Sequence, residues 1–225
     1  MTAIAATGTS AELYEQFARI GKALASARRV ELLDLLCQGE RSVEALAQSA
    51  GMGVTNTSQH LQILRAARLV ETRKEGTKVL YRVADEVVCR FFLDLRELAR
   101  GRLAEVEQLV RRLLDDGLEP MGRAELLERM EQGAVVLVDV RPREEFAAGH
   151  IPGALSVPLG LVQDLLDAVP ADTEVVAYCR GPYCLLAPQA LTILRAHGLR
   201  ARRLEDGFPE WRLAGLPVAV GAEER

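Results

Sequence analysis

Several features that would place this chain in a membrane or outside the cell are missing from its sequence. No run of about 18 apolar residues occurs, so no helix is expected to span a membrane. The first ten residues, Met1 to Ser10, lack the basic stretch and the apolar block of a signal peptide. These two absences favour a cytoplasmic protein without a membrane partner.

Cysteine is scarce, and its spacing excludes the common zinc folds. The four cysteines are Cys37, Cys89, Cys179 and Cys184. None of them forms a CxxC pair of the kind that zinc ribbons and fingers use. In a reducing cytosol they are expected to be free thiols rather than a disulfide framework. The sequence therefore predicts no metal site and no cofactor.

The chain also lacks an excess of basic residues, which at first argues against nucleic acid. Its net charge is −4. The two halves differ, however, because residues 1–117 hold 17 Lys+Arg and 16 Asp+Glu, whereas residues 118–225 hold 11 and 16. This asymmetry suits a DNA-binding first half and a second half that stays off DNA.

The first half has the pattern of a mainly α winged helix-turn-helix domain. Apolar residues at three- and four-residue spacing predict helices over Ala11–Leu24 and Ser26–Cys37, the second ending at Gly39. Ser42 is suited to cap a short helix, Val43–Ser49, and Thr55 or Asn56 to cap a helix that runs to about Ala67. Between them lies the turn Gly51-Met52-Gly53. The alternating segments Leu69–Lys74 and Lys78–Val83 predict a hairpin that turns at Glu75-Gly76-Thr77.

A long helical pattern follows over about Asp85–Leu114, with an apolar stripe and charged flanks. A helix of this length projects from a small domain, so the stripe is expected to pair with a second copy in a homodimer. The alternative is that it packs wholly within its own chain. Asp115–Pro120 is the expected linker. It separates a winged helix-turn-helix DNA-binding and dimerisation domain, residues 1–116, from a second domain, residues 117–225.

The second helix of the predicted helix-turn-helix carries short polar side chains of the type that meet base edges and phosphates. The candidate DNA-binding residues on this helix are Thr57, Ser58, Gln59, His60, Gln62 and Arg65. On the hairpin they are Arg73, Lys74 and Lys78, with Arg82 beside them. His60 is alternatively a surface residue that stabilises the helix. The expected partner is double-stranded operator DNA, with an affinity that falls steeply with salt.

The segment Ser58–Arg65, followed by Leu69-Val70 and Lys74–Tyr81, resembles the recognition helix and wing of the ArsR/SmtB family of winged-helix repressors. The resemblance covers about Glu12–Leu113. It implies a homodimeric repressor that a signal releases from DNA; a winged helix used for protein contacts is the alternative.

Many members of that family sense metal through a Cys-x-Cys motif on the helix before the recognition helix. Here that helix begins Ser42–Ala47 and has no cysteine. Cys37 and Cys89 lie among apolar residues, where buried cysteine commonly acts as a small hydrophobe. Some sulfur-responsive members use one cysteine in each of these regions, which leaves a redox pair as the alternative.

The second half alternates helices and strands, which predicts an α/β domain with a parallel sheet. The expected strands are Ala134–Val140, Ala154–Val157, Glu174–Tyr178 and Arg200–Arg203. The expected helices are Arg123–Gln132, Glu144–Ala148, Leu159–Asp167, Leu185–His197 and Phe208–Ala214. The nearly continuous apolar run of the first strand is typical of a buried parallel strand.

Cys179 follows a buried strand and precedes a helix, with the loop Arg180–Cys184 between them. A thiol at such a turn faces backbone N–H groups and the positive end of a helix dipole, both of which favour the nucleophilic thiolate. Arg180 adds a nearby cation that could recruit an anion such as thiosulfate. These features make Cys179 the candidate nucleophile, with Arg180 beside it.

Five segments of the second half resemble the rhodanese family in order, over about Met121–Val218. They are Leu137–Arg141, Glu145-Phe146, Gly149–Ala154, Tyr178–Arg180 and Asp206–Trp211. The resemblance implies that Cys179 takes a sulfane sulfur as a persulfide and passes it to an acceptor. Asp139 and Arg141 would help to fix and polarise the site, or form only a salt bridge that holds the loop. His150 is expected to be structural.

The loop from Cys179 to Cys184 has six residues, the short form that the resemblance links to sulfur transfer. Phosphatase-like relatives have an arginine six places after the cysteine, where this chain has Leu185, so phosphate and arsenate chemistry are not expected. Pro182 removes one backbone donor from the loop. Cys184 supplies a second thiol that could resolve a persulfide on Cys179 as a bridge, or else is only a buried neighbour.

Three functional hypotheses remain open. The leading one is a transcriptional repressor that responds to reactive sulfur or redox signals, with sulfur loading of Cys179 relaxing DNA binding through the linker and the long dimer helices. Its partners would be operator DNA, a second copy and a small sulfur donor such as thiosulfate or polysulfide. The second is primarily a thiosulfate or persulfide sulfurtransferase. Sulfurtransferase activity is expected to accompany transcriptional regulation. The third is a metal- or arsenite-responsive repressor that uses Cys179 and Cys184 as ligands.

Overall fold

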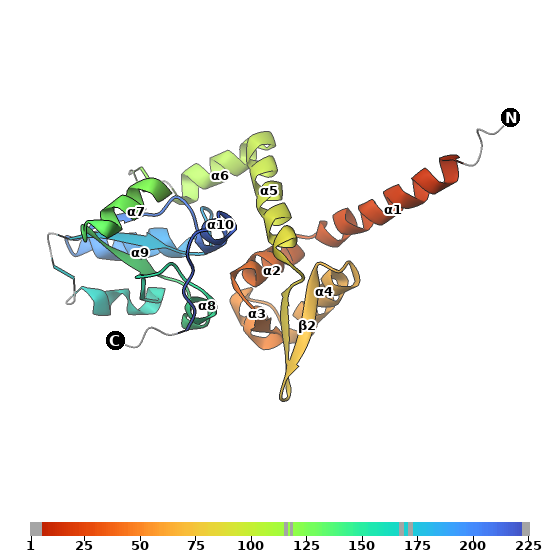
Figure 1. The fold of residues 1–225 in the computed structure, drawn as a ribbon, viewed down its shortest axis with the longest axis horizontal. Helices are drawn as coiled ribbons and strands as arrows, with labels where there is room; N and C mark the ends of the chain where they lie inside the picture. Colours follow the sequence, from red (N-terminus) through yellow and green to blue (C-terminus); the bar gives the residue numbers. More distant parts are fainter. Residues whose placement is uncertain (1–5, 115–116, 118, 167–168, 171–172, 222–225) are drawn as a thin grey trace. The chain divides into compact units, whose positions relative to one another are not determined.

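The computed structural model describes residues 6–114, 117, 119–166, 169–170 and 173–221. The chain divides into two compact units, Met1–Phe92 and Leu93–Arg225 (Figure 1). The boundary between them falls inside a helix, and the expected domain boundary at residues 116 and 117 stays a prediction. Three of the six expected linker residues, Asp115, Asp116 and Leu118, lie outside the described residues. Among the described residues, no helix is long and apolar enough to cross a bilayer.

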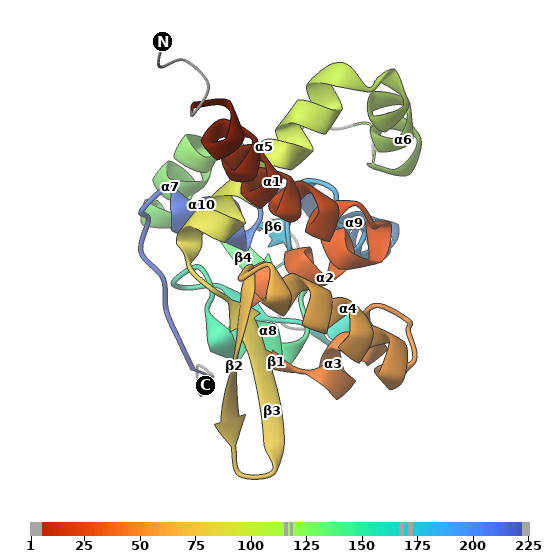
Figure 2. The same ribbon diagram turned by 90° about the vertical axis from the view of Figure 1, so that its right-hand side faces the viewer.

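In its described part, residues 6–92, the first unit has four helices, a three-stranded sheet and the beginning of a fifth helix. The helices are α1 (Ala6–Leu24), α2 (Ala27–Gln38), α3 (Val43–Ser49), α4 (Val54–Ala66) and α5 (Glu86–Arg102). The strands are β1 (Arg41–Ser42), β2 (Val70–Glu75) and β3 (Lys78–Val83). All pairs are antiparallel, in the order β1-β3-β2. Helices α3 and α4 form the helix-turn-helix, and β2–β3 extends away from them as the wing (Figure 2).

Local sequence signals predicted the bounds of α3 correctly, but they did not predict the first residue of the next helix, α4. The side chain of Ser42 accepts a hydrogen bond from the backbone N–H of Ala45, as expected of an N-cap. Helix α4 begins at Val54 with Gly53 as its N-cap, so the expectation of a cap at Thr55 or Asn56 is wrong. Strand β1 was not anticipated, because two residues are too short to show a period; it is defined by its pairing of Arg41 with Tyr81.

The core of the first unit gathers the inward faces of its helices. Leu32, Leu33 and Leu36 of α2 are fully buried, as are Leu46 of α3 and the two leucines of α4, Leu61 and Leu64. Helix α5 contributes Val88, Cys89 and Phe92, which are spaced so that they share one face. The beginning of α5 is therefore part of the packed body of this unit.

The expected continuous helix over about Asp85–Leu114 is interrupted. Helix α5 ends at Arg102, and α6 (Ala104–Leu114) begins after Leu103. The backbone N–H of Val106 bonds the carbonyl of Leu103 in the first turn of α6. Gly101 lies just before the break, and glycine is about 1 kcal/mol less favourable than alanine in a helix interior. The apolar periodicity continues across this point, which explains why the pattern alone suggested one helix.

The second unit contains a four-stranded parallel sheet between helices. Its strands are β4 (Val135–Asp139), β5 (Leu155–Ser156), β6 (Glu174–Tyr178) and β7 (Arg200–Arg203), in the order β5-β4-β6-β7. The helices are α7 (Arg123–Glu131), α8 (Arg143–Ala148), the 3₁₀ segment η1 (Leu159–Leu165), α9 (Leu186–Ala196) and α10 (Phe208–Leu213). The expected α/β architecture with a parallel sheet is confirmed.

Alternate residues of each strand face two separate cores. On one face, Val138, Val175 and Ala177 pack with α9 and η1. On the other, Leu137, Val176 and Tyr178 pack with residues from α7, α8 and α10, including the fully buried Trp211. Both faces of the sheet are covered, as parallel sheets require, and Cys179 follows β6 in the α9-side core.

Candidate functional site

The helix-turn-helix presents the outward face of α4 with its polar side chains. Gln59, Gln62 and Arg65 are exposed, and Ser58 and His60 are partly exposed. The amide of Gln62 donates a hydrogen bond to the Tyr81 hydroxyl of β3 at 3.1 Å, which joins the helix to the wing. Five of the six candidate residues on α4 thus retain accessible surface.

Thr57 differs from the other candidates on α4. Its side chain is fully buried, and its hydroxyl donates to the carbonyl of Gly53 at 3.1 Å. Positions 57, 61 and 64 share one face of the helix at i, i+4 and i+7, and Leu61 and Leu64 are buried with it. This side chain therefore fastens the start of α4 to the core and has no surface to offer to a base.

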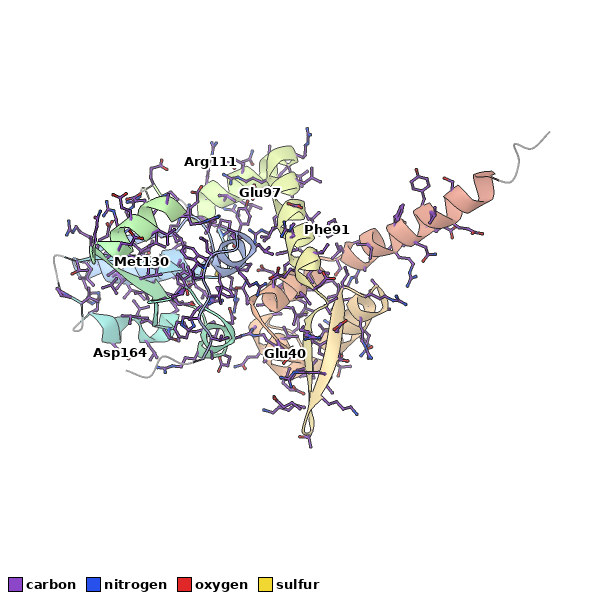
Figure 3. The ribbon with its side chains drawn as sticks, viewed as in Figure 1. Glu40, Phe91, Glu97, Arg111, Met130 and Asp164 are labelled. Carbon is purple, nitrogen blue, oxygen red and sulfur yellow. The ribbon has the colours of Figure 1, made fainter. Side chains whose placement is uncertain are left out.

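The candidate cations of the wing are exposed on β2 and β3. The guanidinium of Arg73 lies 2.6 Å from the carboxylate of Glu40, labelled in Figure 3, and 3.3 Å from that of Glu75. Arg82 pairs with Glu71 at 3.0 Å. Lys74 and Lys78 lie at the end of the hairpin on either side of its turn. A phosphate would have to compete with carboxylates for the two arginines but meets the lysine ammonium groups at an open surface.

Cys37 and Cys89 meet inside the first unit. Cys37 belongs to the last turn of α2, Cys89 to α5, and their Sγ atoms are 2.6 Å apart. Both residues are buried and both are free thiols. Two segments 52 residues apart in sequence therefore bring two thiols into direct contact, which spacing in the chain did not reveal.

In the second unit, Cys179 lies at the carboxyl end of β6 and is only 3% exposed. Its thiol donates toward the carbonyl oxygens of Gly181 and Cys184, each at 3.8 Å. Burial raises the pKa of Cys179 well above its ordinary value, and the hydrogen bond to Cys184 adds to this, while the backbone of Ala187 and Gly181 acts in the opposite direction. Burial therefore outweighs the N–H groups that were expected to favour the Cys179 thiolate.

Cys184 has the opposite electrostatic environment. A hydrogen bond from the Cys179 thiol lowers the pKa of Cys184 to about 7, and burial opposes this in part. Backbone hydrogen bonds from Leu186 and Arg180 and the charge of Arg180 also act to lower it. Leu186 is the first residue of α9, so this thiol lies at the positive end of a helix. Of the two thiols, Cys184 is thus the one that carries the thiolate more readily.

Asp139 and Arg141 form an ion pair with no exposed surface on either side chain. The guanidinium Nη2 of Arg141 is 2.6 Å from Oδ2 of Asp139, and Nε bonds the same carboxylate. Nη2 also donates to the carbonyl of Gly149 at 2.7 Å, and the guanidinium lies 4.4 Å from the centroid of the Phe208 ring. Arg141 thereby connects the end of β4 with the segment after α8 and with α10.

Arg180 is bound by a carboxylate that sequence reasoning had noted only as part of a motif. Its guanidinium makes a two-armed contact with Glu145 of α8, with Nη2 2.7 Å from Oε1 and Nε about as close to both oxygens. Glu145 is buried. The pair holds the cysteine loop against α8, and recruitment of an anion by Arg180 stays a prediction.

The cysteine loop is also in backbone contact with the start of α10. Gly207 is the N-cap of that helix, and a Cβ there would overlap the backbone nitrogen and Cα of Gly181. The peptide N–H of Phe208 donates to the carbonyl of Cys179 at 3.2 Å. Only a glycine allows the two segments to approach this closely.

Within the second unit, the last part of α5 contacts the cysteine loop. Arg96 is 2.5 Å from Glu210 of α10, and its guanidinium lies 5.0 Å from the centroid of the Tyr183 ring. The hydroxyl of Tyr183 donates to Glu97 at 3.2 Å. Figure 3 labels Glu97 on α5. No motif signalled these contacts, because they depend on tertiary placement. Among the described residues, no group of three or more His, Cys, Asp or Glu is placed to hold a metal ion.

Comparisons with known proteins agree with this division. The model of the bacterial regulatory protein, arsR family, matches residues 26–72, and that of the rhodanese-like domain matches residues 123–214. The HTH-type transcriptional regulator Rv0324 of Mycobacterium tuberculosis is 50% identical over 212 residues, 94% of each chain. A sulfurtransferase of Allochromatium vinosum is 36% identical over 86 residues, 38% of this chain and 79% of the relative.

A solved structure matches the first part of the chain. It is the homodimeric winged helix-turn-helix DNA-binding domain (fragment 1–100) of Mb0332 from Mycobacterium bovis, described as a possible ArsR-family transcriptional regulator. It is 47% identical and covers 46% of this chain and 94% of that chain, with a TM-score of 0.42.

The two units thus define a transcriptional regulator joined to a thiol-bearing α/β domain. The chain belongs to the ArsR family of HTH-type transcriptional regulators and carries a C-terminal rhodanese-like domain.

The ion pair between Asp139 and Arg141 gives a test of whether these residues hold the fold. We expect Asp139→Asn to lower the free energy of unfolding of the second unit by about 3–5 kcal/mol, because it leaves a buried guanidinium without its counter-charge. The single tryptophan, Trp211, is buried in this unit and reports its unfolding in urea by fluorescence. The half-exposed Arg123 pairs with Asp206, and Arg123→Met should cost only about 0–1 kcal/mol. Equal effects of the two changes would contradict a structural role for the buried pair.

Proposed function

We propose that this chain is a homodimeric DNA-binding repressor whose affinity for operator DNA falls when reactive sulfur species modify the Cys179–Cys184 loop. The observation that carries the proposal is the pair of cysteines in the loop after β6 of the rhodanese-like domain of an ArsR-family regulator, where the Cys179 thiol donates toward the carbonyl of Cys184 at 3.8 Å. Neighbouring thiols accept sulfane sulfur and close to a bridge by thiol–disulfide chemistry. One chain then holds both the element that reads DNA and the element that reacts.

The surface of the first unit supports the DNA-binding part of the proposal. Exposed polar side chains of α4 lie beside a wing that carries Lys74 and Lys78, so base edges and phosphates could be met together. Large apolar side chains that are exposed in the single chain support a homodimer. They are Leu13, Tyr14 and Phe17 on α1, Leu98 on α5, and Leu109 and Leu113 on α6.

Helix α5 is the element through which modification of the Cys179–Cys184 loop is proposed to change the affinity for DNA. It is one helix from Glu86 to Arg102. Its beginning is anchored in the core of the first unit by Val88 and Phe92, and its end holds Arg96 and Glu97 against the residues around Cys179. A change in the loop therefore acts on a helix whose first residues belong to the DNA-binding unit.

Cys37 and Cys89 are a second thiol pair in the same regulator. Their contact lies between α2 and α5 inside the DNA-binding unit. A bridge between them would act on that core directly, without the rhodanese-like domain. The functional experiment must therefore separate the two pairs.

The proposal is tested with operator DNA selected from a random-sequence library by the reduced wild-type protein. We expect sodium tetrasulfide to raise the Kd of the wild type by roughly 5- to 150-fold, the usual range of allosteric coupling, measured by fluorescence anisotropy. A Cys179→Ser/Cys184→Ser double variant should bind the DNA normally when reduced and lose the response. Cys37→Ser is the matched variant for the other pair and should keep it. A response that survives in the double variant and disappears with Cys37→Ser would place sensing in the first unit instead.

If the effect of sulfur on DNA affinity passes through α5, a substitution on this helix weakens the response to sulfur without changing DNA binding by the reduced protein. Arg96→Met removes the contact with Glu210 and the contact with the Tyr183 ring but leaves both thiols in place. We expect this variant to bind reduced-state DNA and to take up sulfur like the wild type, with at least about a threefold smaller change in Kd on sulfur treatment. Arg102→Met, an exposed arginine at the end of the same helix, is the control for the loss of charge. An unchanged response in Arg96→Met would exclude this route.

A second candidate function is catalytic sulfur transfer, favoured by the rhodanese-like domain and by the likeness to a sulfurtransferase. Steady-state transfer from thiosulfate to cyanide tests it. We expect slow turnover, because Cys179 is 3% exposed and its pKa is raised. Fast turnover that operator DNA does not affect would favour an enzyme over a sensor.

A further inference from the structure

We propose that α6 forms a second dimer contact of this protein, in which it pairs antiparallel with α6 of another copy across a two-fold axis. The inference rests on the homodimer of the proposed function and assigns a part of its interface to the second unit. It is carried by the exposed apolar side chains of α6, by the order of the charges beside them, and by the ion pairs that orient this helix.

Helix α6 leaves a row of leucines in water. Leu114 is buried by its own chain and is only 4% exposed, whereas Leu109 and Leu113 are 44% and 51% exposed. The two exposed leucines are four residues apart, so they are neighbours on one face of the helix. Covering them would remove apolar surface from water, which is favourable. This face is therefore the part of α6 that a partner would cover.

The charges along the edge of this face change sign from one end of α6 to the other. Glu105 lies about one turn before Leu109, Arg112 lies nearly one turn after it, and both are exposed. The two charges are seven residues, or about 10 Å, apart along the same side of the helix, which is too far for them to pair with each other. Each is placed to meet the opposite charge on a partner.

A second copy of α6 that runs in the opposite direction supplies those charges. A two-fold axis beside Leu109 places Glu105 of one helix opposite Arg112 of the other, and the symmetry repeats this pair on the other side of the axis. The exposed leucines of both copies then meet in the middle. A parallel pair would instead place like charges at the same height. The antiparallel pair is thus the arrangement that matches both the apolar faces and the charges.

Ion pairs on the other side of α6 orient the helix and leave this face open. The chain bends at Leu103 between α5 and α6 (Figure 1). Across the bend, Nε of Arg100 on α5 lies 3.5 Å from the carboxylate of Glu107 on α6, which also pairs with Arg111 at 3.3 Å. Two residues of helix turn by about 200°, so Glu107 and Arg111 both point away from Leu109.

The length of α6 indicates what this contact can contribute. A helix of 11 residues is about 16 Å long, so a pair of them is too small an interface to hold a stable dimer alone. In a dimer that other surfaces also hold, the second α6 is present at a high effective concentration. The contact therefore strengthens an existing dimer, and its loss is expected to raise the Kd of that dimer.

The test is a charge exchange in the full, reduced chain, with the Kd of the dimer measured by sedimentation equilibrium. We expect Glu105→Arg and Arg112→Glu each to raise this Kd by about fivefold or more, because each altered side chain faces a like charge on both sides of the axis. The double variant Glu105→Arg/Arg112→Glu exchanges the two charges and should return the Kd to within about twofold of the wild type. Arg111→Glu reverses a charge on the opposite side of α6 and is the matched control, with a Kd close to that of the wild type.

Cross-linking tests the direction of the pair. Glu105→Cys and Arg112→Cys chains are made separately and mixed until their subunits exchange, and a short bismaleimide is then added. We expect far more covalent dimer in the mixture than in either variant alone, with the wild type giving the background from its own cysteines. Equal cross-linking of each variant alone and of the mixture would indicate a parallel pair and overturn the inference.

The outcomes separate this inference from the proposed function. If the wild type is a dimer and neither single charge change alters its Kd, α6 is not in the interface, and the proposed repressor is unaffected. If the double variant restores dimer affinity but sodium tetrasulfide leaves the DNA affinity of the wild type unchanged, the α6 contact is supported and the regulatory proposal is wrong. A variant with a shifted Trp211 emission is replaced by Glu105→Gln or Arg112→Gln, for which the Kd should rise by about twofold. A double variant that dimerises as weakly as the single variants would contradict the pairing.

Discussion

The architecture around the reactive loop depends on one buried ion pair. Asp139 and Arg141 are both withdrawn from water at the end of β4, where a single unpaired charge would be costly. The pair is stable because each remaining polar atom finds a partner, including the Gly149 carbonyl and the aromatic face of Phe208. Since those partners come from the segment after α8 and from α10, one guanidinium fixes three segments. The cysteine loop packs against two of these segments: against α8 through Glu145, and against the start of α10 through Gly207.

Much of this fold could be predicted from local sequence patterns. Strands β3, β6 and β7 and helix α3 have the expected bounds, because alternation, an unbroken apolar run and the Ser42 cap each have one structural solution. The break at Leu103 was missed since the apolar stripe continues through it, and a stripe does not record a change in helix direction. The burial of Thr57 could have been found, because its spacing from Leu61 and Leu64 places all three on one face.

The place of the candidate site in the fold was predictable from the sequence, and the environment of each of its residues was less so. Asp139 and Cys179 lie at, or just beyond, the ends of neighbouring parallel strands at one edge of the sheet, and Cys184 lies in the loop that follows Cys179. Which thiol carries the charge was not predictable, since burial and the N–H groups of the loop oppose each other and only their positions decide the result. The contact between Cys37 and Cys89 and the link from α5 to Tyr183 join segments far apart in sequence, so no local pattern could disclose them.

Gly207 limits how this protein can change over generations. Because its Cα lies against the backbone of the cysteine loop, no other amino acid fits there unless the loop and the start of α10 separate. Mutations that add a side chain at this position therefore alter the reactive loop even though residue 207 itself carries no reactive group. A longer loop that admits a larger substrate would therefore have to lose the contact with Gly207. A protein that keeps this glycine also keeps its six-residue loop confined.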